Sequence, residues 1–224
     1  PLGMVGALLY GATQSALFML LAVYGASMNF TILEISFVTF LLGISGAISQ
    51  YPVGYISDKL DRRIVIIYST FGASIFAMMA IFSVKTMFLP EGLASSKSWF
   101  YVFLILFSFC SLPIFSLILA HTNDFITKDK FVAAGAGLQF AFGLGAMSGP
   151  FLCSLVMDLI GPNGFFIFHI FFHLIIGFFG IHRMKARPVK ENPDSQFVPV
   201  PQTITPVGLE LNPTTEPIEE PYTE

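Results

Sequence analysis

The sequence predicts an all-α membrane protein with six transmembrane helices followed by a disordered tail. Of the 224 residues, 54% are hydrophobic and only 11% are charged, whereas soluble domains carry about 25% charged residues. The apolar residues gather in six runs, each near the ~20 residues that a helix needs to cross ~30 Å of hydrocarbon. These runs are too long for soluble strands and lack the alternation of an outer-membrane barrel.

The six runs set the boundaries of the expected spans. The expected spans are Leu2–Tyr24, Ile32–Val53, Ile64–Val84, Trp99–His121, Phe131–Met157 and Phe165–Ile181.

Two cysteines, Cys110 and Cys153, fall inside these runs, so we expect buried thiols rather than a disulfide framework. The chain begins Pro1-Leu2-Gly3, without an initiator Met or a basic segment, which we interpret as a cut just before a membrane helix rather than a signal peptide.

Small residues and prolines shape these spans. Gly3, Ala7, Gly11 and Ser15 form one stripe at helical spacing on the first span. A second stripe on the fifth span predicts that helix backbones approach closely there. Proline removes a backbone hydrogen bond and bends a membrane helix. The second stripe is Gly137, Ala141, Gly145 and Gly149, and the prolines are Pro52, Pro113 and Pro150.

The distribution of Lys and Arg predicts the orientation. With six spans, both ends of the membrane region lie on one side, and nine of the eleven Lys and Arg residues fall on that side. Only Lys85 and Lys97 fall on the other. Positive residues favour the cytoplasmic side, so we expect both termini in the cytoplasm.

The segment Gly54–Arg63 is the most informative part of the chain. Five of its ten residues are charged, and each Asp, Lys or Arg costs ~2.5–3.5 kcal/mol at the centre of a membrane helix. We therefore expect a tight loop between the second and third spans. Asp58 and Arg62 lie four residues apart, which suits a compact charge network at a helix end.

The order of residues in this segment resembles the signature loop of the major facilitator superfamily. The matching residues are Gly54, Asp58, Lys59, Asp61, Arg62 and Arg63. The resemblance implies that they latch one conformation of a transporter. It also implies a fold of twelve spans built from two halves, with the substrate site between the halves.

The resemblance covers most of residues 1–183 and is greatest to the second half, helices seven to twelve. The fifth span, with Gly145, Gly149 and Pro150 near its middle, is similar to helix eleven of YcaD-type bacterial members. It also partly matches the Gly-Pro motif of drug antiporters, but Cys153-Ser154 replaces the second expected glycine pair. We expect a missing N-terminal six-helix half, or a second copy of this chain, as partner.

The domain organisation follows from a change of composition near Met184. Residues 1–183 form the expected membrane domain. Residues 184–224 contain eight prolines and several glutamates with almost no apolar periodicity, which predicts a disordered cytoplasmic tail.

By family resemblance the first, second, fourth and fifth spans line the substrate cavity. Polar and aromatic side chains near the middle of those spans are our cavity candidates, because intramembrane polar groups usually face a bundle interior or a cavity. The alternative for each polar residue is a hydrogen bond between helices. The candidates are Tyr10, Gln14, Ser108, Ser111, Gln139 and Phe142.

Ionisable residues are scarce inside the spans. No Asp or Glu lies at the centre of any span, so if a proton or another ion drives transport, we expect the coupling carboxylate in the missing half. His169 and His173 lie four residues apart, which suits metal binding or proton relay, but packing with hydrogen bonds is favoured because no third ligand is evident. The fourth span ends in His121, Asn123 and Asp124, which belong either to a gate facing the signature segment or to a solvated helix end.

No catalytic motif, metal site or nucleotide-binding loop is apparent. The sequence thus predicts a non-enzyme without cofactors, and no basic face suggests nucleic acid. The favoured hypothesis is half of a secondary transporter of a small solute in the bacterial inner membrane. The alternatives are a membrane scaffold or sensor with the same fold, and a half-size transporter that works as a homodimer.

Overall fold

The computed structural model describes residues 2–86, 96–127 and 130–186. All regular structure in this part of the chain is helical, and six helical segments are long and apolar enough to cross a membrane. The six predicted spans are therefore confirmed. Of the predicted tail, residues 187–224 lie outside the described residues. The helices are α1 (Leu2–Ser27), α2 (Ile32–Lys59), α3 (Arg62–Thr86), α4 (Ser96–Ser111), α5 (Ile114–Asn123), α6 (Phe131–Ile160) and α7 (Gly164–Ala186).

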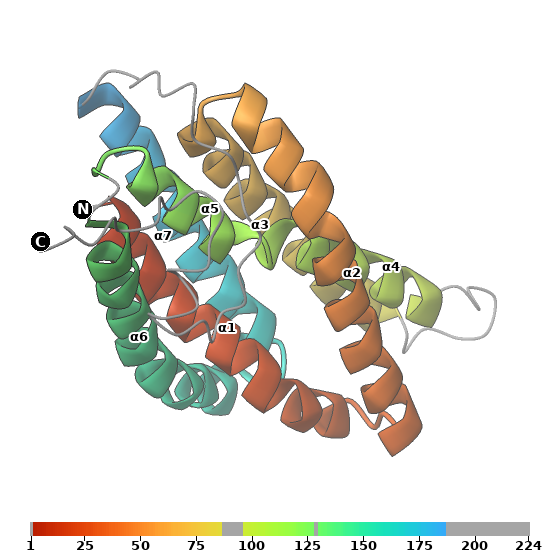
Figure 1. The fold of residues 1–224 in the computed structure, drawn as a ribbon. Coiled ribbons are helices and arrows are strands. Elements are labelled where there is room, and N and C mark those ends of the chain that lie inside the picture. Colours follow the sequence, from red (N-terminus) through yellow and green to blue (C-terminus); the bar gives the residue numbers. More distant parts are fainter. Residues whose placement is uncertain (1, 87–95, 128–129, 187–224) are drawn as a thin grey trace, which may run out of the picture.

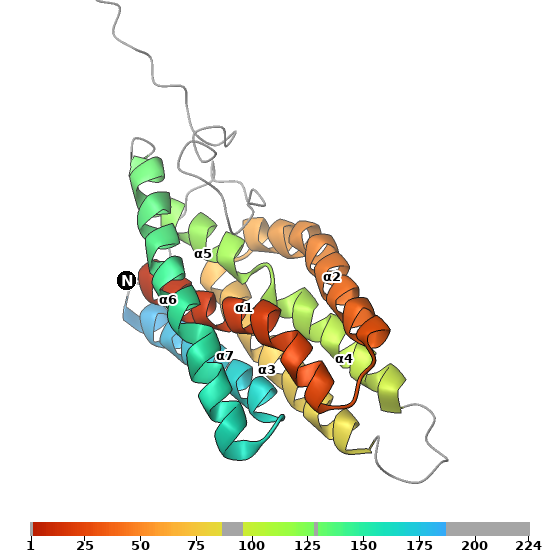
Figure 2. The ribbon, with the colours of Figure 1, turned by 90° about the horizontal axis from the view of Figure 1, so that it is seen from below.

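The helices pack as a bundle in which α1 is central. Figures 1 and 2 show α2 and α6 on opposite sides of α1, and α1 packs most extensively against α6. α3 packs against both α4 and α7, and α2 lies along α4. Large apolar side chains remain exposed on the outside of the bundle, such as Met147 and Leu159, as expected where lipid is the solvent.

Local sequence signals explain where two of the helices end or begin. A capping box starts α2: the Thr31 hydroxyl accepts from the Glu34 backbone N–H, and the Glu34 carboxylate accepts from the Thr31 backbone N–H. Gly161 ends α6 with φ of +82°, a conformation that favours glycine.

The fourth span is broken at Leu112 and Pro113 into α4 and α5, and the break is visible in Figure 2. Pro113 has no N–H to donate to the carbonyl four residues earlier, so the regular helix stops there. The hydroxyl of Tyr10 on α1 donates to the Leu112 carbonyl at 3.1 Å. Buried backbone carbonyls need a partner in lipid, and Tyr10 supplies one at the break.

The predicted loop Gly54–Arg63 is mostly helical, and this corrects the sequence-based expectation. α2 continues through Lys59 and α3 begins at Arg62, which leaves only Leu60 and Asp61 between the two helices. A helix end can carry charges without entering hydrocarbon, so charged residues do not require the helix to stop. The charge density marked the membrane boundary rather than the end of the helix.

Glycines let α1 and α6 approach until their backbones touch. A Cβ added at Gly145 would collide with the Leu8 carbonyl oxygen, and one at Gly149 with the Ala12 carbonyl. On the facing helix, a Cβ at Gly11 would collide with the Phe142 carbonyl. Close backbone contact of this kind replaces the hydrophobic drive that is absent in lipid.

Substitution of Gly145 by Ala should destabilise the bundle by about 1–3 kcal/mol, because α1 and α6 must separate to admit the methyl group. The measurement is unfolding in mixed micelles at increasing SDS. Gly143→Ala is the matched control, because an added Cβ at Gly143 meets nothing within 4 Å. Equal stability of the two variants would contradict the close contact.

Candidate functional site

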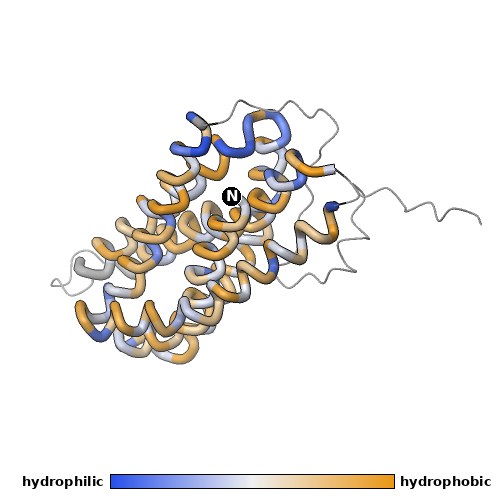
Figure 3. Tube along the Cα trace, turned by 90° about the vertical axis from the view of Figure 1, so that its left-hand side faces the viewer, coloured by the Kyte–Doolittle hydropathy of each residue, from blue (hydrophilic) through white to orange (hydrophobic). Residues whose placement is uncertain are grey.

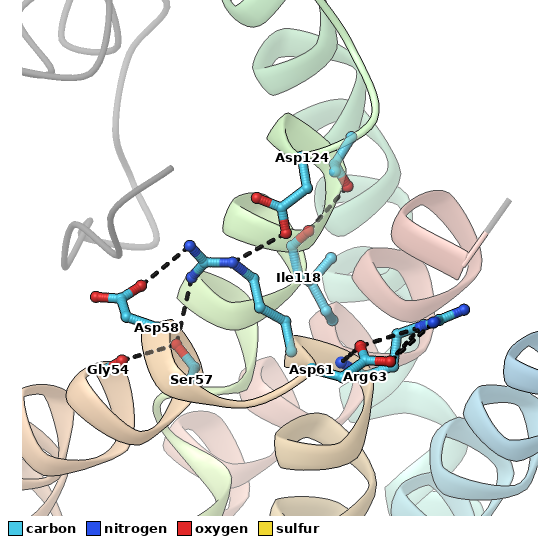
Figure 4. A network of polar contacts seen from close by, with 9 residues as sticks. Gly54, Ser57, Asp58, Asp61, Arg63, Ile118 and Asp124 are labelled. Atoms are coloured by element: carbon cyan, nitrogen blue, oxygen red, sulfur yellow. Dashed lines mark hydrogen bonds and ion pairs between the residues drawn. The ribbon is translucent and has the colours of Figure 1, made fainter. Parts of the chain in front are cut away.

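The side chain of Arg62, the first residue of α3, joins three helices at one end of the bundle (Figure 4). Its guanidinium lies 3.0 Å from the Asp58 carboxylate on α2 and 2.9 Å from the Asp124 carboxylate at the end of α5. It also donates to the Ser57 hydroxyl at 3.3 Å. The Arg62 side chain is only 5% exposed, so its charge depends on these partners.

Asp61 and Arg63 form a second, local pair beside this one. The Asp61 carboxylate accepts from the Arg63 backbone N–H at 3.0 Å, which caps the start of α3. The same carboxylate accepts two-pronged bonds from the Arg63 guanidinium, the shortest at 2.8 Å. Burial alone would raise the pKa of Asp61, but the hydrogen bonds and positive charge of Arg63 outweigh it and lower that pKa below its ordinary value.

The remaining residues of the signature segment support or flank these pairs. Gly54 is buried, and its carbonyl accepts from the Ser57 hydroxyl at 2.8 Å. The Ser57 oxygen then keeps its lone pairs available to accept from Arg62. Lys59 is exposed, and its ammonium contacts the Tyr55 hydroxyl and sits 4.1 Å from the centre of that ring. Lys59 therefore stays outside the buried network.

The geometry ties the ends of α2, α3 and α5 together through one buried cation. A buried guanidinium that loses a carboxylate is left uncompensated, at a cost of about 3–5 kcal/mol. The network is therefore stable while its helices keep these positions, and separation of α5 from α2 would break it. The arrangement suits a latch that holds one position of these helix ends.

Tyr10 and Gln14 on α1, both cavity candidates, are fully buried inside the bundle. Tyr10 stacks on Phe115 with ring centres 6.4 Å apart and uses its hydroxyl at the helix break. Gln14 is 2% exposed, and neither its amide nitrogen nor its amide oxygen has a hydrogen-bond partner among the described residues. An unpartnered buried amide costs about 1–3 kcal/mol, so Gln14 is retained at the expense of stability.

Ser108 and Ser111 on α4 make contacts between helices. The Ser108 hydroxyl donates to the Leu42 carbonyl of α2 at 2.7 Å. The Ser111 hydroxyl lies 2.8 Å from Nε2 of His173 on α7. Both serines are buried within this bundle, and the structure does not bring them together with Gln14 at an open surface.

Two of the three histidines of α7, His169 and His173, contact other helices. Nε2 of His169 lies 3.0 Å from the Thr13 carbonyl of α1, and Nδ1 lies 2.7 Å from the Phe165 carbonyl. His173 contacts Ser111, as above. In the described part of the chain, no group of three His, Cys, Asp or Glu side chains could hold a metal ion.

Candidates on α6 lie at different depths. Phe142 packs on both Tyr10 and Phe115, with ring centres 6.3 and 5.2 Å away. Gln139 is half-buried. Pro150 lies inside α6, next to Gly149 at the contact with α1. Tyr10 and Phe142 are thus adjacent, and Gln139 lies three residues before Phe142, on the same side of α6.

Ser57 was not identified as part of the site from the sequence, and Asp124 was left between two alternatives, a gate that faces the signature segment and a solvated helix end. Ser57 lies inside the signature segment but was not singled out, and only the fold shows its hydroxyl under Arg62. Asp124 was one of three residues at the end of the fourth span, and its contact with Arg62 bridges two distant parts of the chain. A pairing of this kind carries no local sequence signal.

Comparison with known protein families identifies the family of this chain. The family model described as Major Facilitator Superfamily matches residues 3–215. The chain belongs to the major facilitator superfamily.

A curated relative is an uncharacterized MFS-type transporter from Yersinia enterocolitica, 25% identical over 166 residues. The match covers 74% of this chain and 40% of the relative, so the chain spans well under two-thirds of that protein. Six apolar helices and membership of this superfamily make the chain an integral membrane protein.

Arg62→Gln should destabilise the protein by about 3–5 kcal/mol, because the Asp124 carboxylate is left buried without its cation. Adding Asp124→Asn should restore part of that loss, with a coupling energy of about 0.5–3 kcal/mol. SDS unfolding of the two single variants and the double variant measures this coupling. Lys59→Gln, which removes an exposed charge, is the control and should change little; additive losses would contradict the buried pair.

The Asp61–Arg63 pair should make stability depend on pH. A carboxyl group whose pKa is lowered in the folded state stabilises the protein above its unfolded pKa, and that contribution disappears as the pH falls through the folded value. The difference in unfolding free energy between the protein and Asp61→Asn should therefore shrink below pH 3.8, the ordinary value. Arg63→Gln should flatten this dependence, as followed by SDS unfolding at a series of pH values.

Proposed function

We propose that this chain is one half of a secondary transporter that moves a small solute across the membrane by alternating access. The observation that carries the proposal is the Arg62 network, which links α2, α3 and α5 in a chain of the major facilitator superfamily. A latch of buried ion pairs can be made and broken as helix ends separate. Members of this family are generally transporters rather than enzymes, which supports a non-catalytic role.

The partner in this proposal is a second six-helix unit. The chain matches only 40% of its transporter relative, and a substrate site between two halves needs both walls. We assign the chain to the second half, similar to helices seven to twelve of YcaD-type members, and the missing N-terminal half supplies the other wall. A second copy of this chain is the alternative partner.

Gln14 is the residue best suited to bind a neutral polar group of the solute. Its buried amide offers both a donor and an acceptor without partners among the described residues. In another conformation that exposes Gln14, its amide would hydrogen-bond to a ligand. The rings of Tyr10 and Phe142, with centres 6.3 Å apart on adjacent helices, would form an aromatic wall beside it. Gln139, Ser108 and Ser111 are the remaining candidates.

The proposed location is the bacterial inner membrane, with both ends of residues 1–183 in the cytoplasm. The bias of Lys and Arg supports this orientation. The end of the predicted tail that follows α7, residues 187–224, would then lie in the cytoplasm. A proton or another ion is the proposed coupling species, and its carboxylate site would lie in the missing half; full coupling in vesicles that contain only these six spans would contradict that assignment.

The test compares solute distribution in cells that carry Asp58→Asn and Asp158→Asn variants. Cells with and without the protein are profiled for small molecules inside and outside. Cells with and without the protein should differ in how a small molecule is distributed between inside and outside. Asp58→Asn should abolish most of that difference, because one carboxylate of the Arg62 latch is lost. Asp158 is an exposed acid near the opposite end of α6, so its variant should keep the difference at equal membrane abundance.

An Asp58→Asn protein that sustains the full difference would contradict the transport proposal and favour a scaffold. The mass of the native polypeptide in its own membrane decides the partner. A mass near 24.6 kDa indicates a half-size protein that needs a second copy. A mass roughly twice as large indicates a missing half within the same polypeptide.

A further inference from the structure

A cavity of about 320 Å³ lies at the end of the bundle that contains the signature segment. It is enclosed by the first turn of α1, the ends of α5 and α7, and the start of α6, with Arg63 of α3 at one side. Figure 3 shows hydrophilic residues gathered at this end, near the N-terminus. The cavity therefore opens at the level where hydrocarbon meets water, and its volume falls at the lower end of the ~300–1,000 Å³ of small-molecule sites.

The lining is apolar, with a few cationic groups. Its walls include Leu2, Phe125, Ile126 and Leu138, and no Asp or Glu is among the described residues that line it. The positive charges come from two arginines on different helices. An apolar chamber beside fixed positive charge fits a ligand with an apolar chain and an anionic head.

Arg183 of α7 supplies the charge that remains available. Arg63 is paired with Asp61, which compensates its charge. Arg183 is half-buried, lines the cavity and forms no ion pair with any described residue. A guanidinium is well suited to bind the phosphate of a lipid headgroup because its N–H groups match the phosphate oxygens.

We propose that this cavity is a binding site for an anionic phospholipid. The phosphate lies against Arg183, and part of an acyl chain enters the apolar chamber between α1, α5 and α6. Basic pockets between membrane helices on the cytoplasmic side bind anionic headgroups. The site goes beyond the proposed transport function and rests on the cavity and its charges alone. Its contact with Arg63 places the lipid beside the signature segment.

Native mass spectrometry of the full natural polypeptide tests the site. The protein in detergent is titrated with phosphatidylglycerol, and separately with phosphatidylcholine. One phosphatidylglycerol should bind preferentially. Arg183→Gln should weaken it about ten- to hundredfold, the value of a hydrogen bond to a charged group.

Lys185→Gln is the matched control for charge, because Lys185 is an exposed base two residues away that does not line the cavity. Gly137→Leu tests the chamber itself: Gly137 lines it, and an added Cβ meets nothing within 4 Å. Gly143→Leu, equally open but outside the lining, is its control. Both Leu variants should keep the thermal stability of the protein, but only Gly137→Leu should lose the lipid.

Three outcomes would overturn the proposal. Equal loss with Lys185→Gln and Arg183→Gln would show general surface attraction rather than a site. Displacement of phosphatidylglycerol by inorganic phosphate alone would show a site for a soluble anion. Equal binding of phosphatidylglycerol and phosphatidylcholine would also overturn it.

Discussion

Every backbone carbonyl and N–H inside the membrane must find a partner within the protein, and the architecture of this chain depends on that constraint. Helices satisfy it over most of the length, and the break at Leu112 and Pro113 is where a regular helix fails to do so. At that point Tyr10, on a helix more than a hundred residues away in sequence, donates a hydrogen bond to the Leu112 carbonyl. Ser108 and Ser111 of α4, and His169 and His173 of α7, also contact other helices, so these polar groups hold the bundle together.

The same constraint separates structural polar groups from those free for function. Ser108, Ser111 and His173 have partners that fully explain their burial. Gln14 does not, and an amide kept without partners is more readily explained by a ligand or another conformation than by packing. The network around Arg62 is a third class, because charges are buried there although hydrophilic residues gather at this end of the bundle.

The sequence predicted the six spans well because length and hydropathy are local properties of the chain. The charge segment was located correctly but interpreted as a loop, since hydropathy marks where hydrocarbon ends and not where a helix ends. The contacts of Asp124 with Arg62, and of Tyr10 with the break, could not be predicted because they depend on how distant helices pack. The cavity beside Arg183 was not predicted either, since five separate segments form its walls.

Only two residues, Leu60 and Asp61, connect α2 to α3. Such a short link leaves the two helix ends little freedom to move apart, and the next residue, Arg62, is bound to Asp124 at the end of α5. A displacement of the end of α2 would therefore be passed to the end of α5 through Arg62. Because α2 also lies along α4, both parts of the broken fourth span are tied to α2.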